Sequence, residues 1–216
     1  MDFAQSAARL IAARNIDLTL DVGANAGQFG TLLREKYQYT GKIISFEPLD
    51  DAYARLAQTA SGDPLWQCVK TALGDAEGTS VINVSANSWS SSLLEVVPKS
   101  LEFEPSIGYI GRQDVTIRRL DALVGELCPV SQSIFLKLDV QGYETQVLLG
   151  ALTILDRVKL IQIETSLLPV YAGEPLVGDM VKSLDFLGFR IVAVEPGWSD
   201  PETGELLQMD LMLARK

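Results

Sequence analysis

The chain has 216 residues, 47% of them hydrophobic, which suits one domain of ordinary size with a substantial core and argues against disorder. Its 18 basic and 28 acidic residues give a formal net charge of -10, which disfavours nucleic acid or an anionic membrane surface as a partner. The chain contains no histidine, so any proton abstraction falls to a carboxylate, Lys or Tyr.

The N-terminal segment, Met1 to Ile16, is predicted to form a packed helix rather than a signal peptide, because it has an early Asp2 and apolar residues at helical spacing. No stretch of the chain approaches the roughly eighteen uninterrupted apolar residues that a membrane span needs. The two cysteines, Cys68 and Cys128, form no C-x-x-C pair and indicate neither a zinc site nor a disulfide framework. We therefore expect a soluble chain in a reducing cytoplasm.

A short apolar strand, Leu18 to Leu20, ends in an acid and runs into a glycine turn with the sequence Asp21-Val22-Gly23-Ala24-Asn25-Ala26-Gly27. A second strand, Lys42 to Phe46, ends in Glu47, about twenty residues after the last glycine. In a strand-turn-helix unit the glycines let the backbone approach a ligand, and a carboxylate after the next strand can accept both ribose hydroxyls. The two segments together predict a nucleoside pocket.

The acid at Asp21 favours a cationic nucleoside over a dinucleotide. An ionised carboxylate pointing into the turn would repel a pyrophosphate, and Gly23 and Gly27 do not make the three-glycine spacing of dinucleotide binders. S-adenosylmethionine carries a sulfonium and an ammonium, has no phosphate, and keeps the ribose for Glu47. NAD, another nucleoside or an ordinary strand-helix turn remain as alternatives.

Further elements follow along the chain. Helical spacing predicts a helix over Leu49 to Ala60, and β-rich runs predict strands at Trp66 to Val69, Thr79 to Val84 and Val115 to Leu120. The irregular stretch from Ser85 to Asp114 is interpreted as an insertion or lid. Trp89 and the three serines after it suit stacking on a sugar face, although a solvated serine loop explains them equally well.

The C-terminal half repeats the alternation of strand and helix. An apolar strand from Ser133 ends in Asp139 and is followed by a helix through about Leu152, and another strand, Val158 to Ile163, is followed by Glu164. The remaining predictions are a helix and two strands: Gly178 to Leu187, Phe189 to Val194 and Gln208 to Ala214. Near-continuous apolar strands alternating with helices indicate an α/β fold, with a mostly parallel sheet covered on both faces, in a single domain over residues 1–216.

Acids follow four of the predicted strands: Asp21, Glu47, Asp139 and Glu164. The carboxyl ends of parallel strands lie at one edge of a sheet, where ligands bind. An acid after a strand can also cap the next helix, and for any one of the four that role is about as plausible. Four such acids together predict a functional site at the carboxyl edge of the sheet.

The segments DVGANAGQFG, FEPLDDAYARL, LKLDVQGYETQVLLGA and IQIET, in this order, resemble the FkbM family of S-adenosylmethionine-dependent methyltransferases. The resemblance implies a class I, Rossmann-like methyltransferase fold with six parallel strands and one antiparallel strand near the C-terminus. It implies that the methyl donor is held by residues of the turn, by the acid after the second strand and by the segment after the third strand: Asp21, Gly23, Asn25 and Gly27 for the methionine portion, Glu47 for the ribose, and Ala72 and Leu73 beside the adenine. Gln141 departs from the family motif, which usually has Glu at this position.

Asp139 is the preferred residue to act as general base or to orient the methyl acceptor, because it is expected to face the methyl donor. Lys137 projects to the same face of the strand and could lower the pKa of that carboxyl or bind a developing alkoxide, or else it is a lysine that reaches the rim or pairs with an acid. Glu164 could bind acceptor hydroxyls, cap a helix or pair with Lys137. Asp139 and Glu164 could instead hold a divalent cation such as Mg²⁺.

The leading hypothesis is an O-methyltransferase acting on a hydroxyl group of a saccharide or sugar-bearing metabolite, because the resembling family works largely on such oxygens. The first alternative transfers the methyl group to nitrogen or to a carboxylate of a small molecule. The second is a noncatalytic nucleoside-binding domain within a larger assembly. The acceptor and the oligomeric state are not predicted further.

Overall fold

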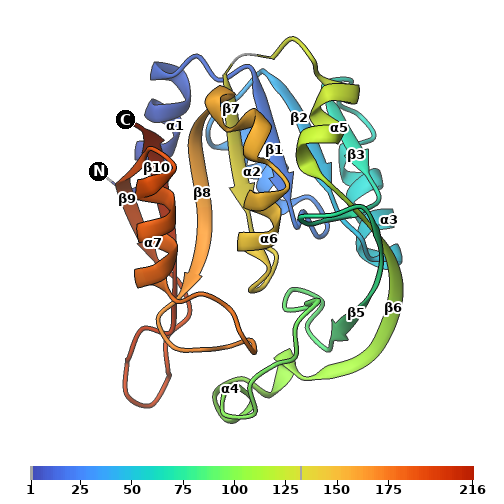
Figure 1. The fold of residues 1–216 in the computed structure, drawn as a ribbon, viewed down its shortest axis with the longest axis vertical. Coiled ribbons are helices and arrows are strands. Elements are labelled where there is room, and N and C mark those ends of the chain that lie inside the picture. Colours follow the sequence, from blue (N-terminus) through green and yellow to red (C-terminus); the bar gives the residue numbers. More distant parts are fainter. Residues whose placement is uncertain (1, 132) are drawn as a thin grey trace.

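A seven-stranded sheet runs through the middle of the molecule in the order β3-β2-β1-β7-β8-β10-β9 (Figure 1). The computed structural model describes residues 2–131 and 133–216, so Met1 of the predicted N-terminal helix lies outside the described residues. The strands of this sheet are β1 (Leu18–Val22), β2 (Lys42–Phe46), β3 (Trp66–Val69), β7 (Ile134–Leu138), β8 (Val158–Ser166), β9 (Phe189–Pro196) and β10 (Gln208–Arg215).

The pairing of the strands confirms the class I arrangement. β1 pairs in parallel with β2 and β7, and the further pairs β2–β3 and β7–β8 are also parallel. β10 is antiparallel to both β8 and β9, so it is the single reversed strand, inserted between two parallel ones. The chain order reverses between β1 and β7, and open α/β sheets bind ligands at such a switch point.

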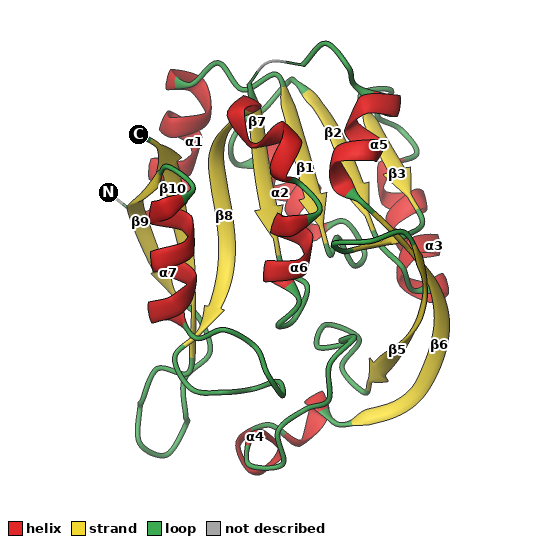
Figure 2. Cartoon of the chain, viewed as in Figure 1, coloured by secondary structure: helices red, strands yellow, loops and turns green. Residues whose placement is uncertain are grey.

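Six helices cover the two faces of the sheet, three on each (Figure 2). Apolar residues of α5, α6 and α7 pack in one core cluster, whereas those of α1, α2 and α3 pack in the other. With both faces covered, the central strands are buried over their whole length, as the burial of all five residues in β1 and β7 shows. The bounds are α1 (Phe3–Ala13), α2 (Gln28–Glu35), α3 (Asp50–Ala60), α5 (Leu120–Leu127), α6 (Glu144–Leu149) and α7 (Val177–Phe186).

A second, three-stranded sheet in the order β4-β6-β5 extends from the carboxyl end of β3 (Figure 2). It consists of β4 (Ala72–Leu73), β5 (Gly78–Ser85) and β6 (Tyr109–Arg118). The predicted irregular stretch, 85–114, is therefore shorter, because β6 already begins at Tyr109 and leaves residues 86–108 between the strands. These residues include the short helix α4 (Ser100–Phe103) and a 3-10 turn (Pro105–Ile107).

The predicted strand from Val115 to Leu120 is wrong at its end, since Leu120 opens α5. The missed first half of β6 is mostly polar and exposed, and it is held by backbone pairing with β5 rather than by burial, so its residues carry no apolar pattern. The other predicted strands and helices are present within a few residues. No helix in the described part of the chain is long and apolar enough to cross a membrane.

Candidate active site

A cavity of about 680 Å³ opens at the carboxyl ends of the central strands. This volume is in the range that small-molecule sites occupy. Much of its wall comes from three parts of the chain: the turn after β1 with the start of α2, residues 47–49 and 71–73, and the ends of β7, β8 and β10. Residues between 87 and 107 close a fourth side. The cavity therefore lies at the switch point of the sheet, with the irregular segment over it.

Glu47 lies in the cavity wall directly after β2, and its carboxylate organises the neighbouring backbone. One oxygen accepts a hydrogen bond from the Asn25 N–H at 2.8 Å, and the other accepts one from the Leu49 N–H at 2.9 Å. Burial raises the pKa of Glu47 to about 7, although both hydrogen bonds oppose that rise. A carboxylate with free acceptor capacity at this position suits the two hydroxyls of a ribose.

Gly23 makes the close approach between the β1 turn and the end of β7. Its φ of +78° is in the left-handed region, and a Cβ placed there would lie 1.8 Å from the carbonyl oxygen of Asp139. A side chain at this position is therefore excluded twice, by the backbone conformation and by contact. Gly23 and Asn25, which has a φ of 45°, both line the cavity.

Gly23→Ala is expected to destabilise the fold more than Gly173→Ala does. Gly173 has nearly the same φ, +80°, but nothing lies within 4 Å of its added Cβ, so that variant measures the backbone cost alone, about 1 kcal/mol. The contact with Asp139 should add roughly 1–3 kcal/mol at Gly23. Denaturant unfolding of both variants measures the difference, and equal losses would mean that the turn relaxes away from β7.

Asp21 does not lie in the cavity wall, contrary to the prediction that it faces the ligand. It is fully buried beneath the cavity, where its carboxylate accepts a hydrogen bond from the Ser45 hydroxyl at 2.9 Å and lies 3.8 Å from Lys137 Nζ. Burial raises the pKa of Asp21, and the positive charge of Lys137 opposes that rise. Asp21 therefore contacts Lys137, a residue of the cavity wall, but does not line the cavity itself.

Gly27 also lies outside the wall. It caps α2 with a φ of +91°, and an added Cβ would meet Leu56, Thr59 and Trp66 at 3.1–3.2 Å. The glycine thus permits the packing of α2 against α3 and β3. Ala72 and Leu73, in contrast, form β4 and line the cavity on the side of Glu47, where the resemblance places the adenine.

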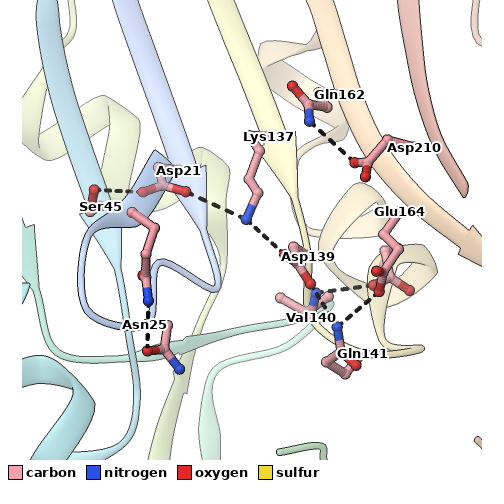
Figure 3. A network of polar contacts seen from close by, with 12 residues as sticks. Asp21, Asn25, Ser45, Lys137, Asp139, Val140, Gln141, Gln162, Glu164 and Asp210 are labelled. Carbon is pink, nitrogen blue, oxygen red and sulfur yellow. Dashed lines mark hydrogen bonds and ion pairs between the residues drawn. The ribbon is translucent and has the colours of Figure 1, made fainter. Parts of the chain in front are cut away.

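Lys137, Asp139 and Glu164 come together on the other side of the cavity, as predicted (Figure 3). The ammonium of Lys137, a buried residue of β7, donates to Asp139 Oδ2 at 3.0 Å. Gln141 donates from Nε2 to Asp139 Oδ1 at 2.7 Å and to Glu164 Oε2 at 2.8 Å. The alternation of side chains along β7 thus puts Lys137 and Asp139 together, and the following turn joins them to β8.

Acidic side chains outnumber basic ones on this side of the cavity. Burial, together with the negative charges of Asp139 and Asp210, raises the pKa of Glu164 well above its usual range, and burial also raises the pKa of Asp210. Lys137 is the single positively charged side chain among the described residues of the cavity wall. Its pKa is raised by Asp139 and Asp21, which outweigh the opposing effect of burial. The wall therefore favours neutral or cationic ligands over anionic ones.

Sequence reasoning missed several polar residues of this wall. Asp210 on β10 lies directly opposite Glu164 on β8 in the strand pairing, and it accepts a hydrogen bond from Gln162 at 3.2 Å. Tyr171, in the loop after β8, donates its hydroxyl hydrogen to Gln141 Oε1 at 2.6 Å. The sequence signal available for Asp210 was an acid inside an otherwise apolar final strand. The sequence around Tyr171 carries no such signal.

The segment 86–108 is tied to both sides of the cavity. Asn25 Nδ2 donates to the carbonyl of Ser88 at 2.7 Å, and the Ser92 hydroxyl donates to the carbonyl of Gln141 at 2.6 Å. Trp89, 63% exposed, stands in the wall between these two contacts.

Glu144 is structural, since its buried carboxylate accepts the N–H groups of Val140 and Gly142 and so holds the turn that carries Gln141.

No group of three or more Cys, Asp or Glu side chains within residues 2–131 and 133–216 is arranged to hold a metal ion. Asp139 and Glu164, the two acids proposed as metal ligands from the sequence, are joined instead by the Gln141 amide. The cavity does fit S-adenosylmethionine, because it joins a carboxylate with free acceptor capacity, a glycine turn and a wall with more acidic than basic side chains in one volume.

The sheet order, the reversed strand β10 and the cavity at the switch point are those of the class I methyltransferase fold. A sequence profile described as the Methyltransferase FkbM domain matches residues 21–191. The chain therefore belongs to the FkbM family of S-adenosylmethionine-dependent methyltransferases. No curated protein matches the chain in sequence.

Solved structures share the fold at low sequence identity. A methyltransferase FkbM from Methylobacillus flagellatus KT superposes with a TM-score of 0.55 at 12% identity, covering 91% of this chain and 44% of that one. The chain thus spans less than half of that protein's length. An rRNA methylase from Streptococcus thermophilus has a TM-score of 0.52 at 12% identity, covering 100% and 97% of the two chains. Magnesium protoporphyrin IX methyltransferase from Synechocystis PCC 6803 with bound SAM has a TM-score of 0.51 at 12% identity, covering 99% and 78%.

Proposed function

We propose that the chain is an S-adenosylmethionine-dependent O-methyltransferase that acts on a hydroxyl group of a saccharide or sugar-containing metabolite. The observation that carries the proposal is the Lys137–Asp139 pair, with its 3.0 Å contact, in the same cavity as Glu47. On one side of the cavity, the Glu47 carboxylate would accept the hydroxyls of a ribose. The other side has a carboxylate and an ammonium that suit a hydroxyl losing its proton.

Glu47 would accept the ribose hydroxyls, while Gly23 and Asn25 would present backbone to the methionine portion and Ala72 and Leu73 would border the adenine. S-adenosylmethionine supplies a methyl group on a positively charged sulfur, which an acceptor attacks in line. Asp139 would orient the acceptor hydroxyl and take its proton. Lys137, held between Asp139 and Asp21, would stabilise the negative charge on the oxygen.

Glu164 and the segment 86–108 complete the proposed acceptor site. Glu164 would bind a second acceptor hydroxyl, and the segment would exclude water from the reacting groups. Trp89, which is exposed at the cavity wall, would stack on a sugar ring. The negative wall speaks against acceptors rich in phosphate, and the net charge of -10 speaks against RNA, the substrate class that the name of one structural neighbour indicates. We expect a cytoplasmic enzyme.

The test is methyl transfer from S-adenosylmethionine with an isotopically labelled methyl group to a panel of neutral glycans, amino sugars and nucleotide sugars. NMR of the products distinguishes a methyl group on oxygen from one on nitrogen or on a carboxylate. Transfer to a sugar oxygen supports the proposal, and transfer to nitrogen or to a carboxylate supports the first alternative. Calorimetry that detects tight NAD binding, and no binding of S-adenosylmethionine or its demethylated product, would overturn the proposed function.

A further inference from the structure

Gln141 occupies the point where the side chains of β7 and β8 converge (Figure 3). It lies in the turn between β7 and α6 with a left-handed φ of 57°. Its Nε2 atom is 2.7 Å from Asp139 Oδ1 and 2.8 Å from Glu164 Oε2, so one nitrogen contacts both carboxylates.

The orientation of this amide follows from its three partners. A primary amide has two N–H donors and one acceptor oxygen. Both donors are used on the two carboxylates, and the oxygen accepts the hydrogen bond from the Tyr171 hydroxyl at 2.6 Å. The reversed orientation would set the amide oxygen against the Asp139 carboxylate, which the orientation with Nε2 between Asp139 and Glu164 avoids.

The backbone around Gln141 is also fixed. The Ser92 hydroxyl donates to its carbonyl at 2.6 Å, and Glu144 accepts the N–H groups of the residues on both sides, Val140 at 3.0 Å and Gly142 at 3.3 Å. The amide is therefore held from the β7 turn, from the segment 86–108 and from the loop after β8. Because these contacts already restrict Gln141, holding Asp139 and Glu164 together costs little additional conformational entropy of its side chain.

A divalent cation joining the same two carboxylates would need oxygen ligands at about 2.0–2.6 Å. Here the space between them contains a nitrogen with its hydrogens at hydrogen-bond distance, and the second oxygen of Asp139 already accepts from Lys137. We propose that the Gln141 amide joins Asp139 and Glu164 in place of a divalent cation and so positions the proposed base without a metal. The inference rests on the proposed function insofar as Asp139 is that base.

Gln141→Glu should convert this arrangement into a cation site. The substitution removes both N–H donors and adds a third carboxylate beside two others, and burial leaves little water to screen them. Three converging carboxylates are a ligand set that Mg²⁺ accepts. Gln38→Glu is the matched control, because Gln38 has a similar left-handed φ of 53° and is exposed, away from the cavity wall.

The experiment titrates magnesium chloride into the wild type, Gln141→Glu and Gln38→Glu, with binding followed by calorimetry. We expect binding that is at least tenfold tighter in Gln141→Glu than in the other two proteins. The proposal is overturned if Gln141→Glu binds no better than Gln38→Glu, or if the wild type binds Mg²⁺ and Asp139→Asn abolishes that binding. Should Gln141→Glu fail to fold, the wild-type and Asp139→Asn titrations still decide.

A second variant, Gln141→Ala, tests the positioning role. It removes the amide without adding charge, so we expect the affinity for S-adenosylmethionine to stay within about threefold while kcat falls roughly 10- to 100-fold. A chelator should leave wild-type turnover unchanged. Unaltered kcat in Gln141→Ala, or loss of wild-type turnover with the chelator, would contradict the proposal. Because the magnesium titration needs no acceptor, its result is independent of whether the proposed methyl acceptor is correct.

Discussion

Replacing Asp139 by asparagine is expected to lower kcat roughly 10²- to 10⁴-fold, the usual contribution of a general base. Asparagine has nearly the same shape but cannot take a proton. Lys137 and Gln141 donate to different oxygens of Asp139, and asparagine keeps an oxygen at only one of those two places. The affinity for S-adenosylmethionine should change little, because in the proposed function Glu47 and the β1 turn hold the donor on the other side of the cavity. Single-turnover kinetics with a labelled methyl group and calorimetry with the donor measure the two quantities separately.

Asp63→Asn is the matched control for this loss. Asp63 also accepts from a basic side chain, with Arg34 Nε at 2.7 Å, but it lies outside the cavity wall. Losing that partly exposed pair should lower stability by no more than about 1 kcal/mol and leave kcat unchanged. Full turnover in Asp139→Asn would remove Asp139 from catalysis and leave Lys137 or Glu164 as the group that acts on the acceptor.

The central sheet was predictable because its strands are buried on both faces. β1 and β7 are apolar over nearly all of their length, and a run of that kind followed by an acid or a glycine turn identifies the strand and its carboxyl end together. The side-chain period of two also predicted that Lys137 and Asp139 share a face, and the 3.0 Å contact between them confirms it. These features are local in sequence.

The position of Asp21 was not predictable in the same way. It pairs across the sheet with Lys137, and that register depends on how β1 and β7 align, which neither segment specifies alone. With Lys137 beside it on β7 and Ser45 beside it on β2, the carboxylate is enclosed within the sheet. A strand-terminal acid in sequence can therefore be a buried partner of the cavity rather than part of its wall.

The remaining wall residues come from segments whose position depends on tertiary structure. Asp210 reaches the cavity because β10 enters the sheet antiparallel beside β8, which places it next to Glu164 and Gln162, 46 and 48 residues earlier in the chain. Tyr171 reaches Gln141 from a loop with no periodic pattern. The polar part of β6 is similar, because pairing with β5 makes it a strand while its composition indicates a loop.

Glu47→Gln is expected to weaken binding of S-adenosylmethionine roughly 10- to 100-fold, since hydrogen bonds to a charged group contribute about 1.5–3 kcal/mol. The wild-type affinity should also depend on pH. Burial raises the pKa of Glu47 to about 7, so the carboxylate becomes protonated as the pH falls through 7. A protonated Glu47 accepts ribose hydroxyls less well, so affinity should fall on acidification from pH 8 to pH 5.

The sign of this dependence separates a role in binding from a role in folding. Folded Glu47 holds its proton to a higher pH than an unfolded glutamate does, so ionisation makes the fold less stable as the pH rises through the window from about 4.5 to 7. Donor affinity should change in the opposite direction, rising over the upper part of that window.

Glu47→Gln should abolish the slope of donor affinity against pH in calorimetric titrations between pH 5 and pH 8. Glu144→Gln should keep it, because the pKa of Glu144 is likewise raised to about 7 by burial but its carboxylate lies outside the cavity wall. A slope that persists in Glu47→Gln and disappears in Glu144→Gln would assign the titration to the turn that carries Gln141 rather than to the ribose acceptor.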